Sequence, residues 1–358
     1  MSRLERLTQE LCPNGVEYKK LKDVAEMKRG TSVTKKDVTV GDIPVISGGR
    51  EPAYYCDKFN REGETITVAG SGAGAGYVQY WTTPIFVCDA FSVKGLDFVQ
   101  TKYLYYCLSN MQEDIYSTKK GGGVPHVHIS SIENFKIPVP PIEVQREIVR
   151  ILDNFTELTA ELTAELTARR KQYEYYRDEL LTFGDDVERY TLREVCTIKN
   201  GKDYKLFPAG EYPVYGSGGI MTYIDRYAYD KPSVLIPRKG SIDKLYYVDS
   251  PFWNVDTIFY TEIYPGVIPK YLYYYLQTQH LENLNTAGGV PSLTQAVLNT
   301  VSIPVPSLEE QQRIVDILDR FDKLCNDITS GLPAEIEARQ KQYEYYRDKL
   351  LTFKDSGC

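Results

Sequence analysis

The chain has 358 residues, of which 42% are hydrophobic and 25% charged, and its net charge is −7. This composition is typical of globular proteins, and the length allows two or more domains. No apolar run is long enough to span a membrane, and the first residues are too charged for a signal peptide, so we expect a cytoplasmic protein. The seven cysteines are scattered without a C-x-x-C pair, so we expect reduced thiols and no zinc site.

The first 140 residues predict a body built mainly of strands. Residues 4–11 have the pattern of a short amphipathic helix, which Pro13-Asn14-Gly15 ends. Strand-like runs separated by Gly or Pro follow at 65–70, 77–81 and 85–93. Residues 101–116 have the apolar spacing of a helix, and a glycine loop and the extended IPVPP segment then lead out of the body.

Residues 142–183 predict one long helix. Its apolar residues recur on one face over about 40 residues, or roughly 60 Å. A helix with such a stripe requires a partner of similar length. Within it, TELTAELTAEL (156–166) is a four-residue repeat, and each copy adds slightly more than one turn, or about 6 Å.

The second half of the chain repeats the first. KQYEYYRDELLTF at 171–183 returns as KQYEYYRDKLLTF at 341–353, and the IPVP segment at 137–155 returns at 303–321. KYLYYCL and GGVPH of the first half return as KYLYYYL and GGVPS (288–292). This pattern indicates a duplicated unit with variable bodies and nearly constant tails.

The second half differs from the first in its loops and in its tail. GSGAGAG (70–76) becomes PRKGSIDK (237–244), as expected when one scaffold presents two different surfaces. The second tail lacks the TAEL repeat, and we expect its helix to break at Gly331 and Pro333. Its predicted apolar stripe consists of Ile314, Ile317, Leu318, Phe321, Leu324, Ile328 and Leu332.

These patterns predict an α+β protein. Two mixed α/β domains are separated by two long helices that form an antiparallel coiled coil, with a pseudo-two-fold internal duplication. The expected segments are 1–141, 142–183, 184–306 and 307–353, followed by a short tail at 354–358. Because acidic residues are concentrated in the helical segments, any binding of DNA would use local basic loops of the bodies.

The paired IPVP-x-x-E-x-Q-x-x-I-V-x-I-L-D segments, the paired KQYEYYRD segments and the TAEL spacer together resemble the specificity subunits of type I restriction–modification systems. The resemblance covers almost the whole chain. It implies a non-catalytic subunit in which each body, a target-recognition domain, reads one half of an asymmetric bipartite DNA target. It also implies that the helices set the gap between the halves and hold two methyltransferase subunits, which two restriction subunits can join. S-adenosylmethionine, Mg and ATP are then expected in the partner subunits, with no cofactor in this one.

Basic and polar loop residues are the candidates for contact with DNA, because Arg and Lys donate to phosphates and to guanine edges. In the first domain they are Arg29, Lys35, Lys36, Arg50, Ser71, Gly72, Lys119, Lys120, His126 and His128. In the second they are Lys202, Lys205, Arg238, Lys239, Ser241 and Lys244. The basic turn 238–241 ranks first, although ordinary solvated surface is an equally good interpretation for any single residue.

Two stretches have competing interpretations. The segment from Gly70 to Ala75 formally fits a dinucleotide-binding loop, but more strand follows where that motif requires a helix, so a hairpin turn is favoured. His126 and His128 could share a metal ion, but no third ligand is evident, and a DNA-facing or structural role is favoured.

The duplicated KQYEYYRD segments predict two copies of one partner-binding patch. Its residues are Gln172, Tyr173, Tyr175, Tyr176 and Arg177 in the first copy and Gln342, Tyr343, Tyr345, Tyr346 and Arg347 in the second. Simple helix packing is the alternative for these residues. For the whole chain, the rival hypotheses are a coiled-coil scaffold that binds no DNA and a nucleotide-dependent enzyme.

Overall fold

A computed structural model describes residues 2–285, 289–327 and 329–357. Gly288 of the second GGVPS segment and Ile328 of the predicted apolar stripe lie outside the described residues. The chain divides into two compact units. Unit 1 consists of Met1–Glu161 and Ile336–Cys358, and unit 2 consists of Leu162–Glu335, so the long helices contribute to both.

The body of unit 1 is built on a four-stranded antiparallel sheet in the order β2-β8-β5-β6. Its strands are β2 (Ala25–Arg29), β5 (Thr65–Ala69), β6 (Val78–Trp81) and β8 (Ala90–Gly95). Two smaller sheets consist of β3 (Ile43–Ile46), β4 (Tyr54–Cys56) and β7 (Phe86–Val87), and of β1 (Tyr18–Lys20) and β9 (Lys136–Pro138). The helices are α1 (Arg3–Leu11), α2 (Leu21–Val24), α3 (Thr101–Asn110), α4 (Gln112–Ser117) and α5 (Ile129–Ile132). Residues of α3 such as Tyr103 and Leu104 share the core with those of β5 and β8.

The body of unit 2 repeats this plan, with a sheet in the corresponding order β11-β17-β14-β15. Its strands are β11 (Cys196–Asn200), β14 (Ser233–Pro237), β15 (Tyr246–Val248) and β17 (Ile258–Ile263). The smaller sheets consist of β12 (Ala209–Gly216), β13 (Gly219–Ile224) and β16 (Trp253–Asn254), and of β10 (Arg189–Thr191) and β18 (Ser302–Pro304). The helices are α7 (Leu192–Val195), α8 (Pro269–Thr278), η1 (Leu281–Leu284) and α9 (Gln295–Leu298). The duplication predicted from the sequence is therefore a duplication of the fold.

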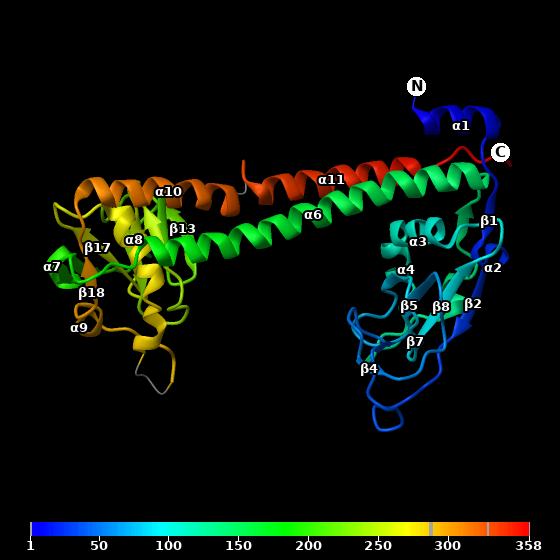
Figure 1. The fold of residues 1–358 in the computed structure, drawn as a ribbon, viewed down its shortest axis with the longest axis horizontal. Helices are drawn as coiled ribbons and strands as arrows, with labels where there is room; N and C mark the ends of the chain where they lie inside the picture. The colour runs from blue at the N-terminus through cyan, green and yellow to red at the C-terminus, as the bar shows by residue number, and fades with distance from the viewer. Residues whose placement is uncertain (1, 286–288, 328, 358) are drawn as a thin grey trace. The chain divides into compact units, whose positions relative to one another are not determined.

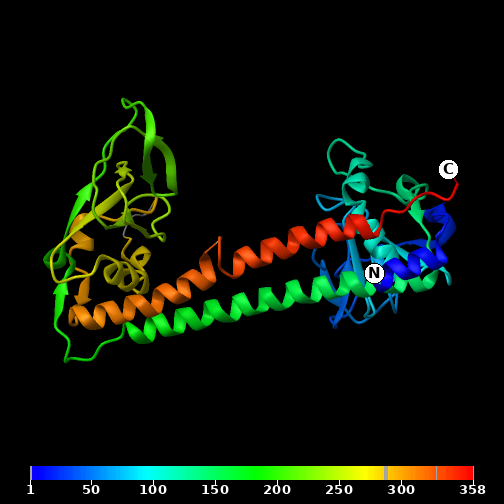
Figure 2. The same cartoon turned by 90° about the horizontal axis from the view of Figure 1, so that it is seen from above.

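Three long helices accompany the bodies: α6 (Ile142–Leu180), α10 (Leu308–Asn326) and α11 (Leu332–Leu350). In unit 1 the first part of α6 lies beside α11, where the Phe155 and Tyr346 rings stack at 5.5 Å. In unit 2 the second part of α6 lies beside α10. There the Tyr176 and Phe321 rings are 5.7 Å apart, and Arg170 donates to the Cys325 carbonyl. Residue numbers rise along α6 as they fall along its neighbour, so the paired helices run antiparallel within each unit, as Figures 1 and 2 show and as the sequence predicts.

The predicted break in the second tail is confirmed between α10 and α11. A side chain at Gly331 would lie 2.6 Å from the Lys323 carbonyl oxygen and 2.7 Å from that of Asp327, so the backbone can come this close to the end of α10 only with glycine. Pro333 occupies the first turn of α11, where its missing N–H leaves no helical hydrogen bond unmade.

Two element predictions were wrong in detail. The run 85–93 is not one strand, because the chain leaves β7, which pairs in parallel with β3, and enters β8 of another sheet after Cys88 and Asp89. The helix predicted at 101–116 is interrupted at Met111, which separates α3 from α4. The helix predicted at 4–11 is confirmed as α1, and Ser2 and Glu5 form a capping box at its start.

No helix in the described part of the chain is long and apolar enough to cross a membrane.

Candidate nucleic-acid interface

Three loops of unit 1 meet at one place, which we call loop cluster 1 (residues 47–50, 70–74 and 120–126). The β5–β6 turn lies against the glycine loop, because Gly72 N donates to Pro125 O at 3.0 Å and Ser71 forms a bridge with His126. The same turn lies against the first loop, since a side chain at Gly48 would collide with the Ser71 carbonyl oxygen. Backbone groups and small residues therefore hold the three loops together.

Loop cluster 2 (residues 217–220, 238–241 and 289–292) is the corresponding place in unit 2. Gly240 N donates to Pro291 O at 3.2 Å, and Lys239 forms a bridge with Ser292. The tip of the β12–β13 hairpin is fixed beside this turn, because Ser217 accepts a hydrogen bond from the Tyr246 hydroxyl at 3.1 Å. Burial raises the pKa of Tyr246, which favours the protonated hydroxyl that donates this bond.

The two clusters share a backbone and differ in side chains. Gly72 and Gly240 occupy matching turn positions with φ of 81° and 79°, a conformation that favours glycine. Three pairs of matching positions carry different side chains: Arg50 and Ile220, Ser71 and Lys239, and His126 and Ser292. Of the first loop in each cluster, only Arg50 was predicted from the sequence, and the loop itself was not singled out. Its signal was the tripeptide Ser-Gly-Gly, which occurs at 47–49 and again at 217–219.

Most candidate residues of the first domain lie in or beside loop cluster 1. Arg50, Ser71, Gly72, Lys120 and His126 belong to it. Lys119 directly precedes its third loop and lies 3.9 Å from the Tyr116 ring centroid, and His128 stacks on His126 at 6.0 Å. Arg29 lines a hollow of about 280 Å³ together with Gly70, Asp89 and the two histidines. Lys35 and Lys36 are exposed on the separate loop between β2 and β3, and no contact joins them to the cluster in the described residues.

In the second domain the structure separates the two basic residues of the favoured turn. Lys239 is exposed, whereas Arg238 is turned back onto the sheet. The Arg238 guanidinium lies 5.0 Å from the Phe259 ring centroid and donates to Asn200 Oδ1 at 3.3 Å. Ser241 belongs to the cluster, Lys244 follows it, and Lys202 and Lys205 lie on the exposed loop after β11.

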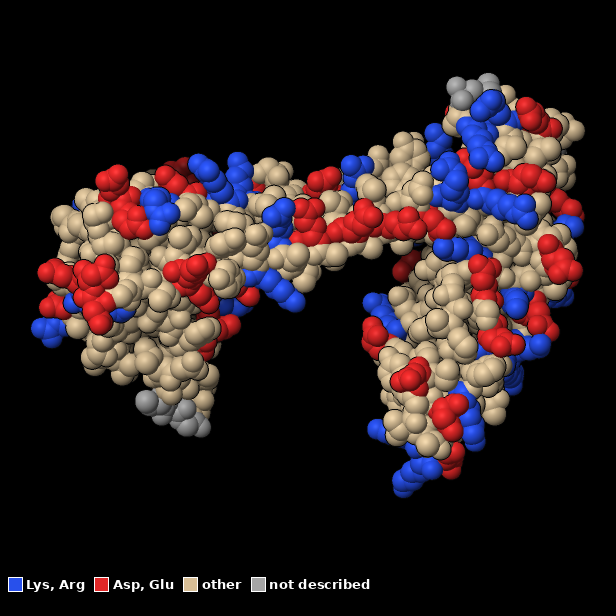
Figure 3. Space-filling model, in the orientation of Figure 1, with Lys and Arg blue, Asp and Glu red and all other residues tan. Residues whose placement is uncertain are grey.

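Charge is distributed differently over the two bodies. On the face drawn in Figure 3, the end of the unit 1 body that lies away from the helices shows Lys and Arg side chains interspersed with Asp and Glu. The body of unit 2 shows few basic residues on that face. The described residues contain no group of three His, Cys, Asp or Glu side chains that could hold a metal ion.

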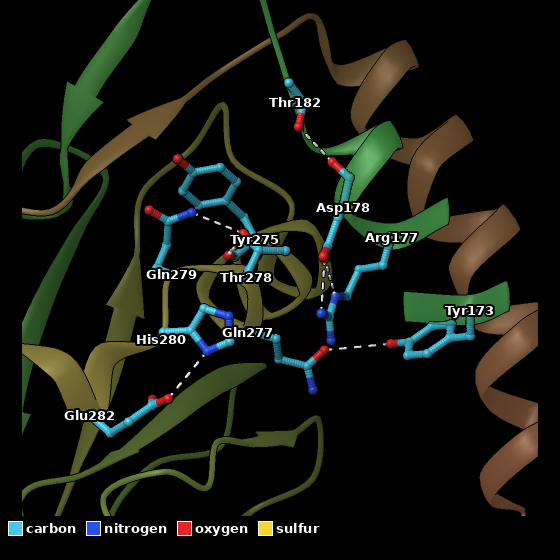
Figure 4. A network of polar contacts seen from close by, with 10 residues as sticks. All are labelled: Tyr173, Arg177, Asp178, Thr182, Tyr275, Gln277, Thr278, Gln279, His280 and Glu282. Carbon is cyan, nitrogen blue, oxygen red and sulfur yellow. Dashed lines mark hydrogen bonds and ion pairs between the residues drawn. The ribbon is translucent and has the colours of Figure 1, made fainter. Parts of the chain in front are cut away.

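Part of each duplicated tyrosine patch packs against the body of its unit. In unit 2 the Tyr173 hydroxyl donates to Gln277 Oε1 at 3.5 Å, and Arg177 lies beside it (Figure 4). In unit 1 the Tyr343 ring packs against the core, and Arg347 Nε donates to Asn110 Oδ1 at 2.7 Å. Each repeat therefore anchors one end of the helical tail to a body.

The other patch residues face outward. Tyr175 is 63% exposed and Tyr345 is 62% exposed, so the two copies present the same ring to solvent. Tyr176 and Tyr346 are partly exposed, and their rings lie against those of Phe321 and Phe155. The side-chain amides of Gln172 and Gln342 accept hydrogen bonds from Arg169 and Arg339.

The sequence profile of the type I restriction modification DNA specificity domain matches residues 13–169 and again residues 184–338. The chain belongs to this family. Its two recognition domains correspond to the two matches, as the resemblance of the IPVP and KQYEYYRD segments predicted. A putative type I restriction enzyme specificity subunit of Haemophilus influenzae is 32% identical over 94% of this chain and 96% of its own length. The EcoR124I/EcoR124II specificity subunit of Escherichia coli is 30% identical over 86% of this chain and 92% of its own length.

Solved structures of type I specificity subunits share the fold. The S subunit of a type I restriction–modification system from M. genitalium superimposes with a TM-score of 0.68 over 94% of this chain and 96% of that one, at 21% sequence identity.

Proposed function

We propose that this specificity subunit binds an asymmetric bipartite DNA target, with each loop cluster reading one half. The observation that carries the proposal is the pair of clusters with one backbone and different side chains. A shared backbone offers loops of the same shape to the duplex, whereas the side chains that meet base edges decide which bases are accepted. Since Arg50, Ser71 and His126 are replaced by Ile220, Lys239 and Ser292, the two half-sites should differ.

The same proposal assigns the chemistry to other subunits. Two methyltransferase subunits bind the chain at the two outward tyrosine patches around Tyr175 and Tyr345, and two restriction subunits can join them. S-adenosylmethionine, Mg and ATP then act in those partners, and this chain contributes recognition and no catalytic residue. The support for two equal docking sites is the near-identical exposure of the two tyrosines.

Sequencing of modified bases tests the proposal directly. DNA from cells that carry this subunit with its methyltransferase should show methylation in one motif made of two unlike short halves, separated by a gap of fixed length. A palindromic motif or a motif of one continuous part would contradict it. Binding of the assembled complex to duplex DNA should also weaken steeply with salt, because basic residues displace counterions from phosphates. A scaffold that binds no DNA would show neither result.

The TAEL repeat provides a second test. Deletion of Thr159–Leu162 removes one copy of the repeat from α6 and about 6 Å of helix. We expect both half-sites to stay the same and the gap to shorten by one or two base pairs, measured by the same sequencing. Altered bases within a half-site would show that the helix does not act as the spacer.

A further inference from the structure

A β-bulge interrupts the β12–β13 hairpin beside loop cluster 2. Tyr215 pairs with Ile220 and Val214 pairs with Thr222, which leaves Met221 without a partner in the register. Bulges re-aim side chains and occur often beside functional sites. The two side chains at this bulge are apolar and open to solvent, since Ile220 is 50% exposed and Met221 is 57% exposed.

The bulge is held against the backbone of the basic turn. The Met221 sulfur lies over Gly216, because a Cβ added to Gly216 would be 2.6 Å from that sulfur and 3.6 Å from Thr257 Oγ1. Thr257 is also bonded to two parts of the cluster. Its carbonyl accepts from Arg238 N at 2.9 Å, and its hydroxyl accepts from Ser217 N at 3.3 Å. The apolar pair therefore lies on a hairpin that Thr257 connects to the turn of exposed Lys239.

The matching position of unit 1 is basic. Arg50 follows the first Ser-Gly-Gly loop as Ile220 follows the second, and its guanidinium lies 5.0 Å from the Tyr77 ring centroid. The same loop thus presents a cation in one unit and an apolar surface in the other. On double-stranded DNA the apolar group that carries sequence information is the 5-methyl group of thymine in the major groove.

We infer that Ile220 and Met221 recognise a thymine methyl group in the half-site that unit 2 reads. The inference rests on the proposed function and deepens it, because it states which kind of base pair this half must contain. Lys239 contacts a guanine edge beside it, and the bulge sets the distance between the two contacts.

The test uses the complex assembled with its methyltransferase and its own mapped target. The half-site of unit 2 is the half whose reading changes in the Lys239→Ala variant. Each thymine of that half is then replaced singly by uracil, which differs only by the missing methyl group. At one or two positions we expect the wild-type complex to bind the uracil duplex about fourfold more weakly than the thymine duplex, which is the effect of losing one buried methyl group. The double variant I220A/M221A should bind the thymine and uracil duplexes equally.

Two variants control the test. Met221→Leu keeps an apolar side chain of similar size and should keep the preference for thymine. Leu206→Ala removes a 94% exposed apolar side chain from the loop after β11, outside loop cluster 2, and should also keep it. The inference is overturned if the half-site contains no A·T pair, if uracil binds as well as thymine, or if the double variant weakens both duplexes and leaves their ratio unchanged. Absence of any sequence-specific binding would instead reject the proposed function, and this inference with it.

Discussion

The two units differ little where each body meets its long helix. In unit 1 the Tyr103 hydroxyl donates to Pro138 O at 3.1 Å, and in unit 2 the Tyr271 hydroxyl donates to Pro304 O at 2.8 Å. Lys102 bonds Asp153 at 2.8 Å, and its counterpart Lys270 bonds Asp319 at 2.8 Å. These repeated contacts fix the angle at which the helix leaves each body.

The loop clusters are where the units differ. Their backbones match at Gly72 and Gly240, yet one cluster carries Arg50 and His126 and the other Ile220 and Lys239. One set of residues, which we call the frame, holds each body against its long helix. A separate set, in the loop clusters, determines which side chains each body presents. Substitutions in the first set should affect both units alike, and substitutions in the second should affect one half-site.

The largest effect is expected from the buried glutamine of each frame. Gln311 is fully buried, accepts from Ile268 N at 2.8 Å and donates to Gly266 O at 3.0 Å and Pro306 O at 2.8 Å. Gln311→Leu leaves these backbone groups without partners and should lower the free energy of unfolding of unit 2 by about 2–4 kcal/mol. Hydrogen exchange measured strand by strand would show the loss in unit 2.

The matched variant is Gln145→Leu, because Gln145 makes the same three kinds of bond to Gln100, Phe98 and Pro140 in unit 1. It should destabilise unit 1 by a similar amount. Gln312→Leu is the control, since this exposed neighbour bonds the Asp316 side chain on the helix surface and its loss should cost less than about 0.5 kcal/mol. A large effect in one unit and a small one in the other would refute the equivalence of the two frames.

A smaller effect should follow at the outward tyrosines. Tyr175→Ala or Tyr345→Ala removes an exposed ring from one patch and leaves the inward anchors Tyr173 and Tyr343 in place. Each single variant should weaken one of two methyltransferase sites about tenfold, as expected for an aromatic interface residue. Calorimetric titration with the methyltransferase subunit should then resolve one strong and one weak site. The Tyr173→Phe variant should keep two strong sites. Two unchanged sites in both alanine variants would remove the patches from the interface.

Much of the frame could be predicted from the sequence, because its signals are local or repeated. The stripe of α6, the break at Gly331 and the repeated KYLYY segment each follow from spacing or from residue type. The inward role of Tyr173 and Tyr343 could not be predicted in the same way. Whether a tyrosine on a helix packs or faces solvent depends on which body covers that face, and periodicity does not identify the body.

The loop clusters were only partly predictable for a related reason. The turn at 238–241 was found because its charges are adjacent, but the contribution of residues 47–50 and 217–220 depends on contacts between loops far apart in the sequence. The inward turn of Arg238 depends on Phe259 and Asn200, which lie on other strands. A basic residue is usually exposed, so residue type alone predicts the outward orientation that Arg238 does not adopt.

An effect of about the same size is a shared response of the two frames to alkaline pH. Tyr106 and Tyr274 are buried and donate to Asp153 Oδ1 at 2.5 Å and to Asp319 Oδ1 at 2.6 Å. Burial, followed by the hydrogen bond to the carboxylate, raises the pKa of both tyrosines far above the ordinary value of 10. In the unfolded chain each ionises near pH 10, whereas in the folded chain each keeps its proton.

Stability from these two hydroxyls is therefore complete below pH 10 and is lost as the pH rises above it, by about 1.4 kcal/mol per pH unit for each tyrosine. Tyr274→Phe removes this dependence from unit 2, and Tyr106→Phe removes it from unit 1. The difference in unfolding free energy between wild type and either variant should shrink by about 1.4 kcal/mol between pH 9 and pH 11. Because both frames contain the same pair, equal changes in the two differences support the comparison. A change in one difference alone would show that only one of the two tyrosines stays neutral in the folded chain.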